Sequence, residues 1–225
     1  MKVLKIFTTA FIFYSLILIG PGTVFAAYPD KPVRVIVPFP PGGATDIVGR
    51  EISEKLSQAF KQTFIVENKP GASGNIGMEM AARAPADGYT LVIGAPQTLT
   101  INPQLMKMSF DPQKELAPIV VIASVPNVLV VNPKLPVNSV KDLIALAKKR
   151  PGKLSYGSSS IGGTPHLSAE MFKAMTGTYI LHIPYRGSSP ALTDLIGGHI
   201  DFMFDNLPAA LPFIQSGALK ALAVT

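Results

Sequence analysis

The sequence predicts an α/β protein of two lobes, each a mostly parallel sheet flanked by helices. Short apolar runs rich in β-branched residues alternate with helical segments along most of the chain. In each half, a predicted strand runs into a glycine-rich turn and then into a helix. Parallel strands require crossover connections of this kind, so the alternation favours sheets covered by helices.

The first half has the order strand, helix, strand, helix, strand. The predicted strands cover residues 33–37, 64–67 and 89–93, and the predicted helices cover residues 46–60 and 76–83. Thr45 or Asp46 is expected to cap the first helix, because short polar side chains satisfy free N–H groups there. This half therefore predicts a βαβαβ unit.

The second half continues the alternation after two apolar runs, residues 119–123 and 128–131, which pass through Pro126 and suggest a crossing between lobes. Ser139 and Asp142 form a capping box for a helix that ends at Lys149, and Thr164 is expected to cap the helix of residues 165–175. The remaining predicted strands are 154–158, 180–183, 200–204 and 219–224, and the remaining helices are 190–196 and 207–215.

Composition excludes several classes of protein. With 48% hydrophobic and 15% charged residues, the chain can build a core and is not disordered. The absence of cysteine excludes disulfides, thiolate metal sites, a cysteine nucleophile and a lipid-modified N-terminus. His166, His182 and His199 lie far apart, so we expect neither a metal nor another cofactor.

Residues 1–26 have the pattern of a secretory signal peptide. Lys2 and Lys5 precede an apolar run over residues 6–19, and small or slender residues lead to a cleavage site near Ala26. The alternative, a membrane anchor, needs roughly 20 apolar residues, which this run does not reach. Without this leader, 18 basic side chains face 14 acidic ones, a surplus too small to indicate nucleic-acid binding. We therefore expect lobe 1 over residues 27–124 and lobe 2 over residues 125–225.

Three glycine-rich turns follow predicted strands, at residues 39–46, 68–75 and 158–164. Ligands bind at the carboxyl ends of the strands in open parallel sheets. Glycine lets the backbone approach a ligand, and the following helix directs N–H groups and its positive dipole end toward it. These turns, with their serine and threonine hydroxyls, favour a small carboxylate. Each of them is also compatible with an ordinary structural turn.

Enzyme motifs are absent from the sequence. It has no Gly-x-Ser-x-Gly elbow, no phosphate loop and no His-Glu-x-x-His helix. Asp46 and Asp205 are more readily explained as structural carboxylates than as a catalytic pair. His166 could donate to a ligand or brace its turn, and Arg186 is the arginine expected nearest the cleft.

Several long segments resemble the substrate-binding receptors of tripartite tricarboxylate transporters, the Bug family. They are residues 28–34, 37–46, 66–77, 83–90, 182–187, 191–198 and 203–206. The resemblance implies a periplasmic, monomeric receptor with the Venus-flytrap fold of periplasmic binding proteins. It also implies that the receptor closes around a small carboxylate-bearing solute and delivers it to a two-component membrane permease.

The resemblance also implies which residues hold the carboxylate, mainly through backbone N–H groups, hydroxyls and water. The implied ligand-binding residues are Phe39, Gly42, Gly43, Thr45, Asp46, Ser73, Gly74, Asn75, Ser158, Thr164, His166 and Asp205. Asp46 would repel a bound carboxylate, so we expect it to cap its own helix or to meet a ligand amino group. Pro165 stands where family members often carry a polar residue.

Other functions remain open at this point. A secreted α/β hydrolase acting on carboxylate esters or amides would need a nucleophile with a base in reach, and the sequence shows none at a recognisable spacing. A binding module used for sensing would share the same cleft. The chain stops at Thr225 inside a predicted buried strand, whereas the resemblance implies further strands and helices. We therefore expect a C-terminally truncated receptor whose first lobe is incomplete.

Overall fold

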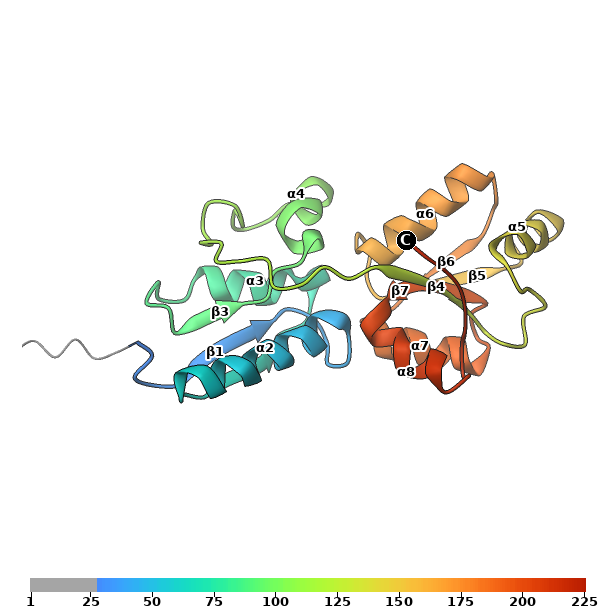
Figure 1. Cartoon of the computed structure of the whole chain (residues 1–225). Coiled ribbons are helices and arrows are strands. Elements are labelled where there is room, and N and C mark those ends of the chain that lie inside the picture. Colours follow the sequence, from blue (N-terminus) through green and yellow to red (C-terminus); the bar gives the residue numbers. More distant parts are fainter. Residues whose placement is uncertain (1–27) are drawn as a thin grey trace, which may run out of the picture. The chain divides into compact units, whose positions relative to one another are not determined.

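The computed structural model describes residues 28–225 (Figure 1). Its first sheet has three parallel strands in the order β2-β1-β3. These are β1 (Val33–Val37), β2 (Phe64–Asn68) and β3 (Thr90–Val92). Val33 lies opposite Phe64, and Val35 lies opposite Leu91. The central strand β1 is the most apolar of the three, which explains its place between the others.

Helices α2 (Ala44–Phe60) and α3 (Asn75–Ala82) connect these strands. Leu56 of α2 packs on the buried cluster of Val33, Val35 and Phe64. In α3, Gly77 lies so close to Pro38 that a Cβ would come within 2.8 Å of the proline Cα. Glycine therefore permits this close packing of helix on strand, and the predicted βαβαβ unit is confirmed.

The second sheet has five strands in the order β6-β5-β7-β4-β8. They are β4 (Asn127–Val131), β5 (Ser155–Ser158), β6 (Leu181–Pro184), β7 (Phe202–Asn206) and β8 (Lys220–Val224). Strand β5 is parallel to β6 and β7, whereas β4 is antiparallel to both β7 and β8. The β5, β6 and β7 segments give this lobe its parallel part, and β4 makes the sheet mixed.

Helices cover both faces of the second sheet, and side chains alternate between them. One buried cluster contains Leu129, Tyr156 and Phe202 with residues of α5 (Val140–Lys149) and α6 (Thr164–Thr176). The other contains Val128, Val130 and Met203 with residues of α7 (Ser188–Gly197) and α8 (Leu207–Gln215). The period-two alternation along β4 and β7 thus builds two separate cores.

The segment between the two sheets differs from the regular alternation. A π-helical turn (Gln97–Ile101) and α4 (Asn102–Leu105) follow β3, although this segment shows no helical periodicity in the sequence. The apolar run at residues 119–123 has no regular secondary structure, and Val121 is 87% exposed. A β-branched run becomes a strand only when another strand pairs with its backbone.

Three local expectations are wrong. The N-cap of α2 is Gly43 rather than Thr45 or Asp46, and the N-cap of α6 is Gly163 rather than Thr164. Both helices begin one or two residues early because these glycines already have the extended backbone of a cap. Strand β8 is an edge strand with mostly exposed residues rather than a buried one. The Ser139 cap of α5 is confirmed, since its side chain accepts from the Asp142 N–H.

No helix within residues 28–225 is long and apolar enough to cross a membrane. The predicted signal peptide at residues 1–26 lies outside the described residues.

Candidate ligand-binding site

Residues from both sheets line one cavity of about 270 Å³. The turn after β1, the segment after β3 and residues 122–125 form part of its wall. The turn after β5 and the first residues of α6 and α7 complete it, with Asn206 at the end of β7. Every lining residue in the described part of the chain is uncharged. The size is near the lower limit for small-molecule sites, which fits a small solute.

The N-terminal ends of four helices meet at this cavity. The N-cap residues of α2, α6, α7 and α8 all line it, and they are Gly43, Gly163, Gly187 and Asn206. None of these four caps makes a side-chain hydrogen bond to its helix. In contrast, α5 begins away from the cavity and is capped by Ser139. The cavity therefore lies at the positive dipole ends of four helices and has no cationic side chain in its lining.

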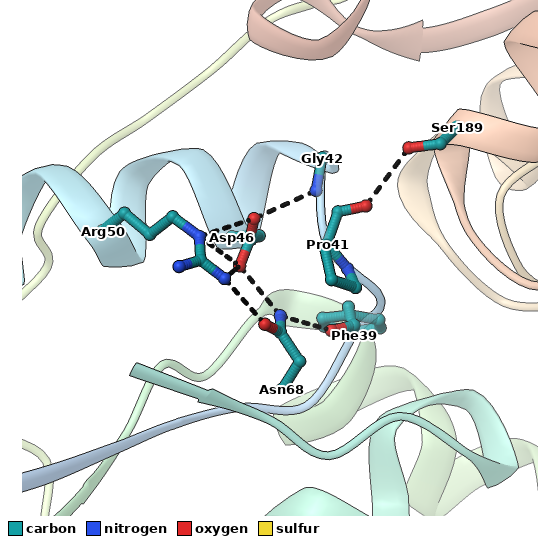
Figure 2. A network of polar contacts seen from close by, with 7 residues as sticks. All are labelled: Phe39, Pro41, Gly42, Asp46, Arg50, Asn68 and Ser189. Atoms are coloured by element: carbon teal, nitrogen blue, oxygen red, sulfur yellow. Dashed lines mark hydrogen bonds and ion pairs between the residues drawn. The ribbon is translucent and has the colours of Figure 1, made fainter. Parts of the chain in front are cut away.

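Asp46 holds the first glycine turn in place from behind. Figure 2 shows its carboxylate between Arg50, Asn68 and the N–H of Gly42. The Asp46 Oδ2 accepts from Gly42 N at 3.0 Å and from Arg50 Nε at 3.0 Å. Asn68 also donates to the Phe39 carbonyl at 3.0 Å. The carboxylate thus fixes the backbone of residues 39–42.

The charge of Asp46 is balanced by these contacts. Burial opposes ionisation of Asp46, but hydrogen bonds from Arg50, Gly42 and Asn68 outweigh it and hold the pKa below its ordinary value. Asp46 is 3% exposed and does not line the cavity. The expected repulsion of a bound carboxylate is therefore avoided by the position of Asp46 and by its partner Arg50.

In the second lobe, a stack of three rings lies behind the glycine turn of residues 158–164. His182 stacks on Tyr156 with ring centroids 4.6 Å apart and on His166 with centroids 4.4 Å apart. His182 Nε2 is 2.7 Å from the Ser158 hydroxyl, and His166 Nδ1 accepts from the Gly162 N–H at 3.2 Å. Both histidines therefore brace the turn.

Burial keeps these imidazoles neutral. Desolvation and the neighbouring His166 lower the pKa of His182 to about 4, and desolvation also lowers the pKa of His166. Nearby, Glu170 accepts hydrogen bonds from the Tyr156 hydroxyl and from Lys173. Burial and the contact with Glu170 raise the pKa of the Tyr156 hydroxyl. Neutral rings can stack closely without charge repulsion, which stabilises the turn in one position.

The Ser158–His182 pair provides a test of the hydrolase hypothesis, because the fold brings together a hydroxyl and a base. Ser158, however, is fully buried and does not line the cavity. Both faces of the His182 ring are covered by other rings. A nucleophile must reach the substrate, so this pair is suited to supporting the turn rather than to catalysis.

Hydrogen bonds join the two lobes beside the cavity. The Gln97 side chain donates to the Ile161 carbonyl at 2.9 Å and accepts from the Ser160 hydroxyl at 2.8 Å. Ser73 donates to the same carbonyl at 3.4 Å. Another contact runs from the Ser189 hydroxyl to the Pro41 carbonyl at 3.1 Å, as Figure 2 shows.

The implied ligand-binding residues fall into three groups in the structure. Phe39, Gly43, Thr45 and Thr164 line the cavity. Gly42, Asp46, Ser158, His166 and Asp205 lie in the turns or behind them and do not line it. Ser73, Gly74 and Asn75 lie at the second glycine turn, also outside the lining. Gly74 leaves room for the Phe39 ring, since a Cβ at this position would lie 3.1 Å from that ring.

Residues that sequence reasoning missed include Gln97, Ser188 and Asn206, which all line the cavity. Ser188 follows a strand and a glycine, which is the same signal that identified the other turns. Gln97 carried no signal, because it belongs to an irregular turn. Arg186 is exposed and does not line the cavity, although it was the arginine expected nearest to it.

The described residues contain no group of three or more histidine, aspartate or glutamate side chains placed to hold a metal ion.

Asp205 is fully buried at the end of β7 and accepts a hydrogen bond from Ser188 at 2.8 Å. It lies one residue before the lining residue Asn206.

Known proteins share this architecture. The tripartite tricarboxylate transporter family receptor model matches residues 48–225. BugT of Bordetella pertussis is 41% identical over 199 residues, which is 88% of this chain and 61% of BugT. A solved periplasmic transporter is 49% identical, with a TM-score of 0.85 over 88% of this chain and 67% of that one. Rpa4515 of R. palustris, solved with adipate, is 44% identical, with a TM-score of 0.84 over the same shares.

The chain thus spans about three fifths of the length of the curated relatives with the strongest matches. Within that span, the two-lobed α/β fold is that of periplasmic binding proteins such as BugD, whose solved structure is 37% identical with a TM-score of 0.78. Since the family model covers most of the sequence, the chain belongs to the family of tripartite tricarboxylate transporter receptors.

Proposed function

We propose that this protein is a periplasmic receptor that binds a small carboxylate-bearing solute and delivers it to a two-component permease of the tripartite tricarboxylate type. The observation that carries the proposal is the uncharged cavity at which four helices begin. Helix N-termini stabilise anions through free N–H groups and the dipole, so this cavity is suited to a carboxylate. Adipate in the relative Rpa4515 supports the same ligand class.

The direct ligand contacts in this proposal are the lining residues of both lobes. Backbone N–H groups at the starts of α2, α6 and α7 bind the carboxylate, and the hydroxyls of Thr45, Thr164 and Ser188 supplement them. Phe39 packs on the apolar part of the solute. Gly42, Ser73, Gly74 and Asn75 shape the turns, and Asp46, Ser158, His166 and Asp205 support them from behind.

The remaining parts of the proposal concern the setting. The leader of residues 1–26 directs export and is removed near Ala26, lobe 1 covers residues 27–124, and lobe 2 covers residues 125–225. The receptor acts as a monomer, needs no cofactor and binds its solute without turnover. Uptake rather than sensing is the role expected of a family named after its transporters.

A thermal-shift panel followed by titration calorimetry tests the function. The panel compares adipate, malate, citrate and glutamate with the dimethyl ester of adipate as an uncharged control. A ligand at 100 times its Kd adds about 2.7 kcal/mol to the free energy of unfolding. We expect at least one acid to stabilise the receptor and the ester not to. Equal binding of ester and acid would contradict recognition by helix N-termini.

A transport assay tests the partner. Cells that express the receptor with its permease should accumulate the radiolabelled acid, and cells without the permease should not. Accumulation that is unaffected by loss of the permease would contradict delivery to it.

A further inference from the structure

Asp205 is a buried carboxyl group without a counter-ion. Its side chain is 0% exposed, and Oδ2 has no hydrogen-bond partner among residues 28–225. Oδ1 accepts from the Ser188 hydroxyl at 2.8 Å. An ionised carboxylate in such surroundings loses its hydration without adequate compensation, so this position favours the protonated form.

The surroundings of Asp205 supply no cation. Met203, two residues earlier on β7, faces α7 and α8, and Asp205 faces the same way by the alternation of the strand. On that face α8 has no titratable residue, and Asp194 of α7 accepts from the Tyr185 hydroxyl. Arg186, which precedes α7, is exposed.

The charged groups of the other elements packed against β7 do not face Asp205. Strand β4 has no titratable residue. The groups of β5 and α6 lie on the opposite face, where Tyr156 and Lys173 contact Glu170 and His166 stacks on His182. In the turn of the first lobe, Asp46 is paired with Arg50. Burial raises the pKa of Asp205 to about 7, although the hydrogen bonds from the Ser188 hydroxyl and the Asn206 N–H favour its ionisation.

Ser188 connects this buried carboxyl to the cavity, because it lines the cavity wall and hydrogen-bonds to Asp205. A hydroxyl has one proton to donate. If Asp205 is ionised, Ser188 donates to it and can only accept from a ligand. If Asp205 is protonated, it donates to the Ser188 Oγ, and the Ser188 proton becomes available to a ligand oxygen.

We propose that Asp205 is a positioning residue whose proton turns the Ser188 hydroxyl toward the bound carboxylate. The receptor therefore takes up one proton when it binds its ligand. This inference rests on the proposed function. The proton comes from solvent and stays on Asp205, and no covalent bond to the ligand forms. The ligand class that this arrangement selects is an ionised carboxylate, because only an acceptor gains from the freed Ser188 proton. A ligand group that donates to Ser188 would favour the ionised form of Asp205 instead.

Calorimetry with adipate in buffers of different ionisation enthalpy tests the linkage at pH 6, 7 and 8. We expect the Kd to rise about tenfold per pH unit above pH 7, with close to one proton taken up at pH 8. Asp205→Asn retains a donor toward Ser188, so it should bind at pH 8 as the native receptor binds at pH 6, with no proton uptake. Asp201→Asn, on the same chain segment but hydrogen-bonded to Ser155, is the matched control and should keep the native pH dependence.

A pH-independent native Kd without proton uptake would overturn the proposal, as would an Asp205→Asn variant that keeps the native pH slope. The state of Asp205 is measured separately by the carboxyl ¹³C shift in the ligand-free receptor, assigned with Asp205→Asn. A carboxyl that is already ionised at pH 5 would also overturn the proposal. If neither adipate nor any other acid of the panel binds at any pH, the proposed function fails, and the ¹³C titration still decides the protonation of Asp205.

Discussion

The side-chain oxygen of Gln97 lies 2.8 Å from the Ser160 hydroxyl, and this hydrogen bond joins a turn that follows the first sheet to a turn of the second. The amide nitrogen of the same side chain donates to the Ile161 carbonyl. Gln97 is 5% exposed and also lines the cavity. A single carboxamide therefore supports both the contact between lobes and the wall of the candidate site.

Substitution of Gln97 should weaken ligand binding. Gln97→Ala removes both hydrogen bonds, and we expect adipate affinity to fall by about tenfold, or about 1.4 kcal/mol. Gln97→Glu should be worse, because a carboxylate oxygen would face the Ile161 carbonyl and repel it. Titration calorimetry measures both effects. Thr100→Ala, in the same turn but bonded only within it to Pro96, is the control and should bind as the native receptor does.

Gly43→Val should close the cavity without unfolding the protein. The Gly43 backbone has a φ of −81°, which valine adopts readily, and a Cβ would meet nothing closer than 3.9 Å. The larger side chain then occupies space that the ligand needs, and we expect affinity to fall at least about a hundredfold, or about 2.7 kcal/mol. Calorimetry measures binding, and circular dichroism melting verifies the fold.

Arg186→Ala is the comparison for this variant, because Arg186 is exposed and outside the cavity lining. We expect only a modest loss of affinity. A larger loss from Arg186→Ala than from Gly43→Val would mean that a cation, rather than the helix N-termini, holds the ligand.

Asp46→Asn should destabilise the fold by about 1 to 3 kcal/mol, because charge-assisted hydrogen bonds to a buried group are lost. The pKa of Asp46 is lowered in the folded state, so its contribution is present above the ordinary value of 3.8 and disappears as the pH falls through the lower folded pKa. Urea unfolding at pH 7 and pH 3 should show the difference between native and variant proteins shrinking at the lower pH.

The control for Asp46→Asn is Glu51→Gln on the same helix, which breaks an exposed ion pair with Lys55. Exposed pairs contribute little to stability, so this variant should remain close to the native protein. A variant at Asp46 that is equally harmless would contradict its proposed role in fixing residues 39–42.

His182 should make the fold sensitive to acid. Its pKa is about 4 in the folded chain and 6.5 in the ordinary state, so the unfolded chain binds more protons between these values. Stability is therefore complete above pH 6.5 and falls as the pH is lowered toward 4. His182→Phe keeps an aromatic ring in the stack and should flatten this part of the pH profile of the melting temperature.

The exposed His199 supplies the comparison for His182. His199→Gln should leave the pH profile as it is in the native protein. Native and His182→Phe proteins with parallel profiles between pH 6.5 and 4 would show that the stacked ring is not the source of the acid sensitivity.

Periodicity and turn residues predict much of this fold. The helix at residues 207–215 matches α8 at both ends, and the glycine turn at residues 39–46 does lead from β1 into α2. Helices α2 and α6 begin earlier than the sequence predicts, because polar residues near both starts are possible caps and the backbone conformation of Gly43 and Gly163 cannot be seen in the sequence. Such starts depend on φ and ψ angles that several residue types can adopt.

Long-range contacts explain what the sequence could not predict about the site. Gln97 reaches Ser160 across 63 positions, and Ser188 reaches Asp205 across 17. No local pattern marks such pairs. Conversely, Ser73 and Asn75 have the glycine-rich setting of a binding turn, yet their side chains contact Ile161 and Asn102 rather than the cavity. Turn chemistry indicates where a site lies, whereas packing decides which side chains face it.

The four helix starts that line the cavity give it partial charges instead of a full one. When an anion leaves a lysine or arginine in a closed space, it leaves an uncompensated cation behind, which costs several kcal/mol. When it leaves a helix start, the opposite partial charge is still present at the other end of the same helix. The empty cavity therefore remains electrically balanced, and loss of an anion from it leaves no buried cation behind.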